Sequence, residues 1–74
     1  MRYAVIIEPS GNGFSAHIPD LPECRCTANT VDEVKRQIRD IVESRIEQLL
    51  RQGEPLPEPT SFCAYIEIGD PIDL

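Results

Sequence analysis

The chain has 74 residues and a formal net charge of −6, from 13 acidic and 7 basic residues. A chain this short removes only about 60% of its unfolded surface from water when it folds, so a partner subunit would help to complete its aliphatic core. The negative charge repels phosphate backbones and attracts basic surfaces, which argues against a direct role in nucleic-acid binding.

No targeting or membrane segment is evident. The chain contains no apolar run approaching the roughly 20 residues that span a bilayer. Its opening run reaches Glu8 too soon for a secretory signal. We therefore expect a cytoplasmic protein with no membrane association, whose cysteines stay as thiols in a reducing compartment.

The first part of the chain predicts three short strands. Residues 3–7 are apolar and rich in β-branched side chains, and residues 14–18 alternate apolar and polar after a glycine-rich connection. This pattern is typical of a β-hairpin. Pro19 and Pro22 then interrupt the second strand, and residues 24–27 are expected to form a short third strand.

A long helix is predicted to follow Thr30. Thr30 and Glu33 have the spacing of a capping box, in which each residue satisfies a free backbone N–H group of the other. Apolar residues then recur every three or four positions as far as Leu50, which predicts an amphipathic helix. Gly53 is the expected C-terminal cap.

The length of this helix suggests self-association. A helix over residues 31–52 would be about 33 Å long, against about 20 Å for a six-residue strand, so its end should overhang the sheet. The overhanging end carries Leu49 and Leu50, which we take as candidate self-association residues. The small core and these leucines predict a homodimer or homotetramer.

The chain after the helix predicts an extended segment and a last strand. Prolines at alternate positions make residues 54–59 stiff and extended, and residues 62–68 have the composition of a strand. The predicted fold is therefore α+β, a single β-β-β-α-β domain over residues 1–74 with the helix across one face of one sheet. Alternation alone lets the last strand lie beside either the first or the third strand.

Several segments recur together in a familiar order. They are the Tyr-Ala-Val-Ile-Ile-Glu opening at 3–8, Gly-Phe-Ser-Ala at 13–16, Ile-Pro-Asp-Leu-Pro-Glu-Cys at 18–24, Thr-Val-Asp-Glu-Val at 30–34 and Gly-Glu-Pro-Leu-Pro-Glu-Pro at 53–59. In this combination the chain resembles the HicB-like antitoxin family from Tyr3 to about Ser61. It departs from the family at Glu23, where glycine is usual, and by the additional Cys26.

The resemblance implies a fold and a partner. The implied fold is a truncated RNase H-like β-β-β-α-β unit without the nuclease carboxylates, with its last strand beside the first. The implied function is to bind and silence a small basic HicA-like toxin that cleaves mRNA. Many members carry a C-terminal DNA-binding domain, and since this chain ends at Leu74 we expect a short form without one.

Four acidic residues are candidate contacts with such a toxin. Two lie in the proline-rich turn and two in the extended segment: Asp20, Glu23, Glu54 and Glu58. Exposed acids in turns can attract a basic partner, although ordinary solvation of loops explains them equally well. The alternative function is an orphan, self-assembling module that has no toxin partner.

The sequence predicts no catalytic, metal or cofactor site, and hence no enzyme. Four carboxylates could in principle hold a nuclease metal ion, but ordinary solvated positions explain all of them: Glu8, Asp20, Glu67 and Asp70. Four soft or borderline ligands lack the spacing of a zinc motif: His17, Cys24, Cys26 and Cys63. The cysteines are expected to pack as small hydrophobic residues.

Overall fold

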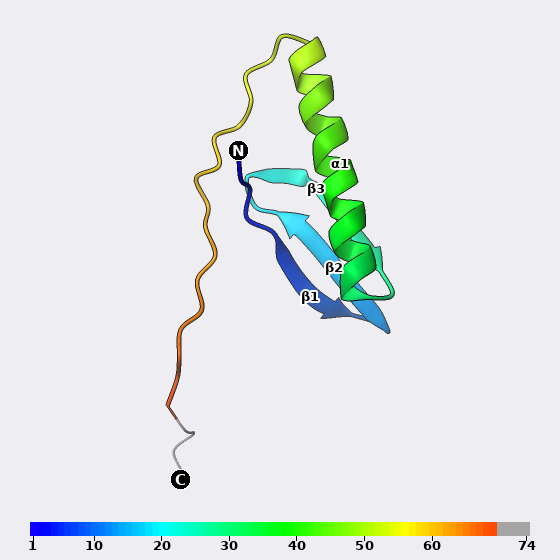
Figure 1. Cartoon of the computed structure of the whole chain (residues 1–74), viewed down its shortest axis with the longest axis vertical. Helices are drawn as coiled ribbons and strands as arrows, with labels where there is room; N and C mark the ends of the chain where they lie inside the picture. Colours follow the sequence, from blue (N-terminus) through cyan, green and yellow to red (C-terminus); the bar gives the residue numbers. More distant parts are fainter. Residues whose placement is uncertain (70–74) are drawn as a thin grey trace.

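The computed structural model describes residues 1–69 and contains three strands followed by one helix (Figure 1). Strands β1 (Ile6–Ser10), β2 (Gly13–Ile18) and β3 (Leu21–Ala28) form an antiparallel sheet in the order β1-β2-β3. Helix α1 (Val31–Arg51) lies across one face of this sheet. The predicted α+β class, with one long helix on one face of one sheet, is confirmed.

The turn of the first hairpin depends on two glycines, Gly11 in the turn and Gly13 at the start of β2. Gly11 has a φ angle of 56°, which a residue with a Cβ atom rarely adopts. At Gly13 the backbone of β3 comes so close that a Cβ atom would collide with the carbonyl oxygen of Ala28. The hairpin predicted from the sequence is therefore confirmed, and Gly13 is also required where β2 meets β3.

The strand bounds differ from those predicted. In the β1–β2 ladder the last pair is Ile6 with His17. In the β2–β3 ladder the register shifts between His17 and Ile18, and Ile18 pairs with Leu21 across the turn. Residues 3–5 therefore lie beyond the last ladder pair and stay outside β1. Strand β3 is longer than predicted because the connection from β2 is tight, which lets pairing resume at Leu21.

The predicted helix boundaries are confirmed to within one residue. The Thr30 side chain accepts a hydrogen bond from the backbone N–H of Glu33 at 3.1 Å. At the other end, Gly53 has a φ angle of 68°, and the N–H of Glu54 donates to the carbonyl of Leu49 at 2.9 Å. These local bonds satisfy backbone groups that a helix end would otherwise leave unpaired.

The core lies between the helix and the sheet. It contains six buried side chains, two of them from the helix: Ala16, Ile18, Leu21, Cys24, Val34 and Ile38. Half-buried apolar residues of the N-terminal segment and the helix pack against this cluster. No helix within residues 1–69 combines the length and the apolar character that a bilayer crossing requires.

After the helix, residues 54–61 run back past the N-terminal segment; we call them the strap (Figure 1). The following residues, 62–68, which we call the arm, extend past the sheet on the side of β1 (Figure 1). The strand predicted for residues 62–68 is not formed in this single chain, where the arm has no ladder pairing. The arm contacts the N-terminal segment at Cys63, whose Sγ lies 3.7 Å from the carbonyl oxygen of Val5. This is a side-chain contact, and within residues 1–69 no fourth strand extends the sheet.

Candidate partner-binding surface

Asp20 holds the strap against the sheet. Its carboxylate accepts hydrogen bonds from the Thr60 hydroxyl at 3.1 Å and from the backbone N–H and hydroxyl of Ser61, both at 3.0 Å. The Ser61 N–H is the main cause that lowers the pKa of Asp20, because these donors favour the charged carboxylate. We call this set of three residues the Asp20 clamp.

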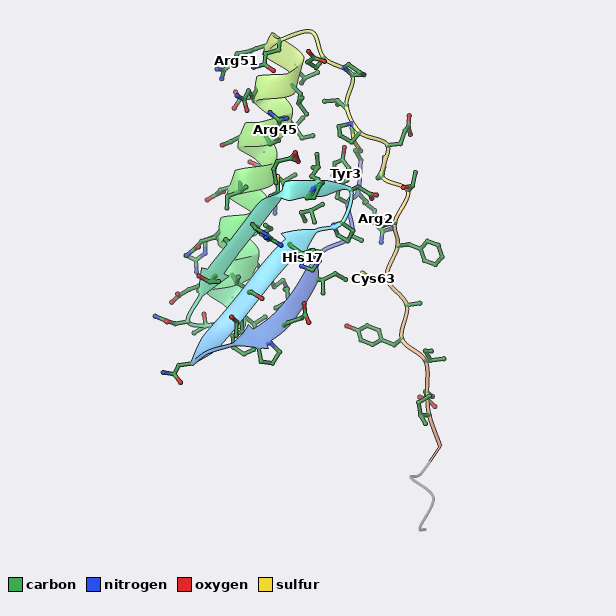
Figure 2. The ribbon with its side chains drawn as sticks, turned by 180° about the vertical axis from the view of Figure 1, so that it is seen from behind. Arg2, Tyr3, His17, Arg45, Arg51 and Cys63 are labelled. Atoms are coloured by element: carbon green, nitrogen blue, oxygen red, sulfur yellow. The ribbon has the colours of Figure 1, made fainter. Side chains whose placement is uncertain are left out.

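Tyr3 fixes the strap at a second point. Its hydroxyl donates a hydrogen bond to the carbonyl oxygen of Pro57 at 2.6 Å, across 54 positions of sequence. Figure 2 shows the Tyr3 side chain lying between the N-terminal segment and the strap. Burial raises the pKa of Tyr3, and the negative charges of Asp20 and Glu58 raise it further. Both acids therefore lie near Tyr3.

The four predicted contact residues do not form one cluster. Asp20 and Glu58 lie on the Tyr3 side of the molecule, where Asp20 is bound to the strap and Glu58 is exposed. Glu54 is exposed where the chain leaves the helix, and its N–H bonds to the helix end. Glu23 lies beside Arg45 of the helix, with Oε2 at 3.9 Å from Nε. Their role as toxin contacts stays a prediction.

The two candidate self-association residues have different environments. Leu49 is 7% exposed, whereas Leu50 is 61% exposed. The strap turns back at Gly53, and its residue Leu56 is half-buried (Figure 1). The helix end that was expected to need a partner thus already buries Leu49 within one chain. Of these two leucines, only Leu50 presents apolar surface for contact with another molecule.

A groove separates the N-terminal segment from the strap and the arm. It has a volume of about 770 Å³, and its lining includes Arg2, Tyr3, Phe62 and Tyr65. Figure 2 shows Arg2 and Tyr3 on one side of this gap. His17 and Arg25 are directly paired across β2 and β3, and they line a separate hollow on the sheet.

Sequence reasoning missed the contacts that dock the strap. They join residues 40, 41 and 54 positions apart, and such distances leave no local periodicity to detect. Two weak signals were present. Thr60 and Ser61 supply hydroxyl donors directly after the proline-rich run, and Tyr3 places a phenol within an apolar segment.

The structure also locates the residues that were considered for metal binding. Cys24 is buried and Cys26 half-buried, and burial raises the pKa of both thiols, which favours the neutral form. Within residues 1–69, no group of three or more His, Cys, Asp or Glu side chains is placed to hold a metal ion. Asp70 lies outside the described residues.

The chain is a small α+β protein with a docked strap that carries two exposed acids, Glu54 and Glu58. A sequence model described as the HicB-like antitoxin of a bacterial toxin-antitoxin system matches residues 3–70. The chain belongs to the HicB-like antitoxin family, and the resemblance recognised from its motifs is confirmed.

The chain is also similar to a protein of Haemophilus phage HP1. That relative is described as an uncharacterized 14.9 kDa protein in the rep-hol intergenic region, and the two are 29% identical over 66 residues. The alignment covers 89% of this chain and 50% of the relative, so the chain spans about half the length of the phage protein. No solved structure gave a significant match.

Proposed function

We propose that the protein is the antitoxin of a toxin-antitoxin pair and that it binds and inhibits a small, basic, HicA-like toxin that cleaves mRNA. In this proposal it acts in the cytoplasm, without catalysis and without binding nucleic acid itself. Membership of the HicB-like antitoxin family is the observation that carries the proposal. The charge of −6 supports it, because a toxin that binds RNA must present a basic surface.

The docked strap is our candidate for the toxin-binding surface. Glu54 and Glu58 are exposed on it, and the Asp20 clamp and Tyr3 keep it in one place before any partner arrives. A segment that is already ordered loses less conformational entropy on binding. Its acids would meet the cationic groups with which the toxin holds RNA, so that electrostatic and steric exclusion act together.

The finer fold assignment belongs to the same proposal. A truncated RNase H-like unit would place its last strand beside the first. The course of the strap and the arm on the side of β1 supports this placement over one beside β3 (Figure 1). Toxin binding would then use the scaffold of a nuclease fold as an interaction surface, with the strap contributing the acids.

A charge-reversal comparison tests the binding surface. Glu54→Lys/Glu58→Lys changes the strap, and Glu43→Lys/Glu47→Lys changes two exposed acids of the helix as a matched control. Each double substitution moves the formal net charge from −6 to −2. We expect the strap variant to weaken binding to the toxin encoded by the neighbouring gene about tenfold or more, and the helix variant much less. Equal effects of both variants would remove the strap from the proposed interface.

The alternative is a self-assembling module without a toxin. One observation favours it: four large apolar side chains of the arm are exposed in the single chain. The neighbouring gene distinguishes the two functions, because it should encode a short basic protein only if this chain is an antitoxin. Self-association is compatible with both functions.

A further inference from the structure

The arm exposes an unusual amount of apolar surface. Its exposed fractions are 87% for Phe62, 100% for Tyr65, 85% for Ile66 and 83% for Ile68. Contiguous apolar surface of this kind marks an interaction site on a soluble protein more often than an ordinary exterior. We therefore expect these exposed side chains of the arm to be covered by a partner surface.

The sequence of the arm is that of a β-strand. It is rich in aromatic and β-branched residues and contains no proline, in contrast to the strap before it. In an extended conformation Phe62, Ala64, Ile66 and Ile68 would share one face, because side chains alternate along a strand. The arm can thus offer both backbone hydrogen bonds and an apolar face to a sheet.

The protein also contains a strand edge that could pair with the arm of a second copy. Strand β1 is at the edge of the sheet and pairs only with β2 among the described residues. Its outer side presents unpaired backbone groups, and such an edge is a template for another strand. The acceptor therefore supplies the backbone partners that the arm lacks.

An apolar groove continues this edge toward the helix. It has a volume of about 420 Å³ and an apolar floor that includes Tyr3, Val5, Ile18, Ile38 and Val42, while the charged residues Lys35, Arg39 and Glu43 of the helix also line it. A strand added beside β1 would lay its inward side chains across this groove. The apolar face of the arm is complementary to it in character.

The direction of the arm favours a second molecule over its own edge. The Asp20 clamp fixes the chain at Ser61, and beyond Cys63 the arm passes the β1 edge of its own sheet without pairing with it (Figures 1 and 2). The molecule measures 57 × 28 × 16 Å, and its radius of gyration is 15.5 Å. A compact chain of this length would have a radius of gyration of roughly 11 Å.

The chemistry of the arm favours a second copy of this chain over a basic toxin. The arm carries a single charge, on Glu67, so it offers little electrostatic attraction to a basic protein. At roughly 150 Å² for each of the three large side chains on the inward face of an arm, Phe62, Ile66 and Ile68, two arms would bury roughly 900 Å². Stable interfaces bury about 1,200–2,000 Å² in total, and the surface that the two arms would cover on the acceptor edges and grooves supplies the remainder.

We propose that the arm of one copy adds as a strand to the β1 edge of a second copy, and that the second copy returns its own arm in the same way. The exchange is symmetric, so both edges and both apolar arms are covered in a closed dimer. It goes beyond the antitoxin proposal, because it holds whether or not a toxin is bound.

The first test measures the oligomeric state of the full chain by sedimentation. We expect a dimer, and we expect Ile66→Asp/Ile68→Asp to weaken it about 100-fold, because two charges would enter an apolar interface. Both side chains are exposed in the single chain, so the variant should keep its fold, as circular dichroism can verify. The matched control, Leu50→Asp at the exposed helix end, should leave the dimer intact. A monomeric wild type, or a dimer lost only in the Leu50 variant, overturns the proposal.

The second test shows whether the arm reaches its own edge or that of another copy. Isotope-filtered nuclear Overhauser spectra of mixed labelled and unlabelled chains should contain contacts between copies, from the Ile66 and Ile68 methyl groups to those of Val5 and Val42. Such contacts within one copy only, or none at all, overturn the proposal. The arm variant keeps the acids of the strap, so its inhibition of the toxin reports separately on the proposed function.

Discussion

Leu49 and Leu50 are neighbours in sequence with different surroundings, and the structure predicts different effects of truncating them. Full burial of a leucine side chain beyond Cβ is worth about 2.4 kcal/mol, at about 0.8 kcal/mol for each of three carbons. Leu49 is 7% exposed and lies in the last turn of α1, where neighbouring groups can relax more than in the middle of the core, so Leu49→Ala should cost about 2–3 kcal/mol, the low end for core leucines. Leu50 is 61% exposed, and Leu50→Ala should cost about 1 kcal/mol or less.

Thermal unfolding followed by circular dichroism measures the difference. Because about 1 kcal/mol shifts the Tm of a domain this small by about 4–8 °C, Leu49→Ala should lower the Tm by about 8 °C or more and Leu50→Ala by clearly less. Both variants should be compared at several protein concentrations. A larger loss for Leu50→Ala that grows on dilution would mean that Leu50 is covered by another copy, and it would refute the assignment of burial within one chain.

Three further outcomes are expected. Gly13→Ala should abolish or severely weaken folding, because its Cβ atom would collide with the carbonyl oxygen of Ala28; a Tm near that of the wild type would contradict this. Thr30→Ala should lower the free energy of unfolding by about 1 kcal/mol in urea titrations, and Thr30→Asp should restore most of it. Since the folded pKa of Asp20 is lowered, its stabilisation of the strap is fully present above the ordinary pKa of 3.8 and is lost as the pH falls through the folded value. The NMR shift of the Ser61 N–H should report that midpoint below 3.8, and in Asp20→Asn this titration should be absent.

Local signals in the sequence were sufficient for the helix and the first hairpin. The Thr30 cap and the Gly53 termination depend on bonds within a few residues, so both could be read directly. The register of the sheet could not be predicted, because the shift between His17 and Ile18 does not change the alternation of apolar and polar residues along the strand. The burial of Leu49 was also missed, because the amphipathic pattern does not distinguish it from its neighbour Leu50, which is 61% exposed.

The candidate site was only partly predictable. Exposed acids in the turn and strap were identified, but the sequence could not show that Asp20 is engaged by the strap while Glu58 remains free. The composition of residues 62–68 was read as a strand, yet composition does not specify which edge a strand joins. In the single chain this segment remains an unpaired arm, and the sheet that would receive it is not identifiable from local pattern.

The most direct test of the antitoxin proposal is an RNA-cleavage assay with the protein encoded by the neighbouring gene. Increasing amounts of the full chain should suppress cleavage to completion at a fixed molar ratio, and native mass spectrometry should find a complex of the same ratio. Cleavage that continues unchanged in the presence of excess chain, with no complex detected, would contradict the proposed function.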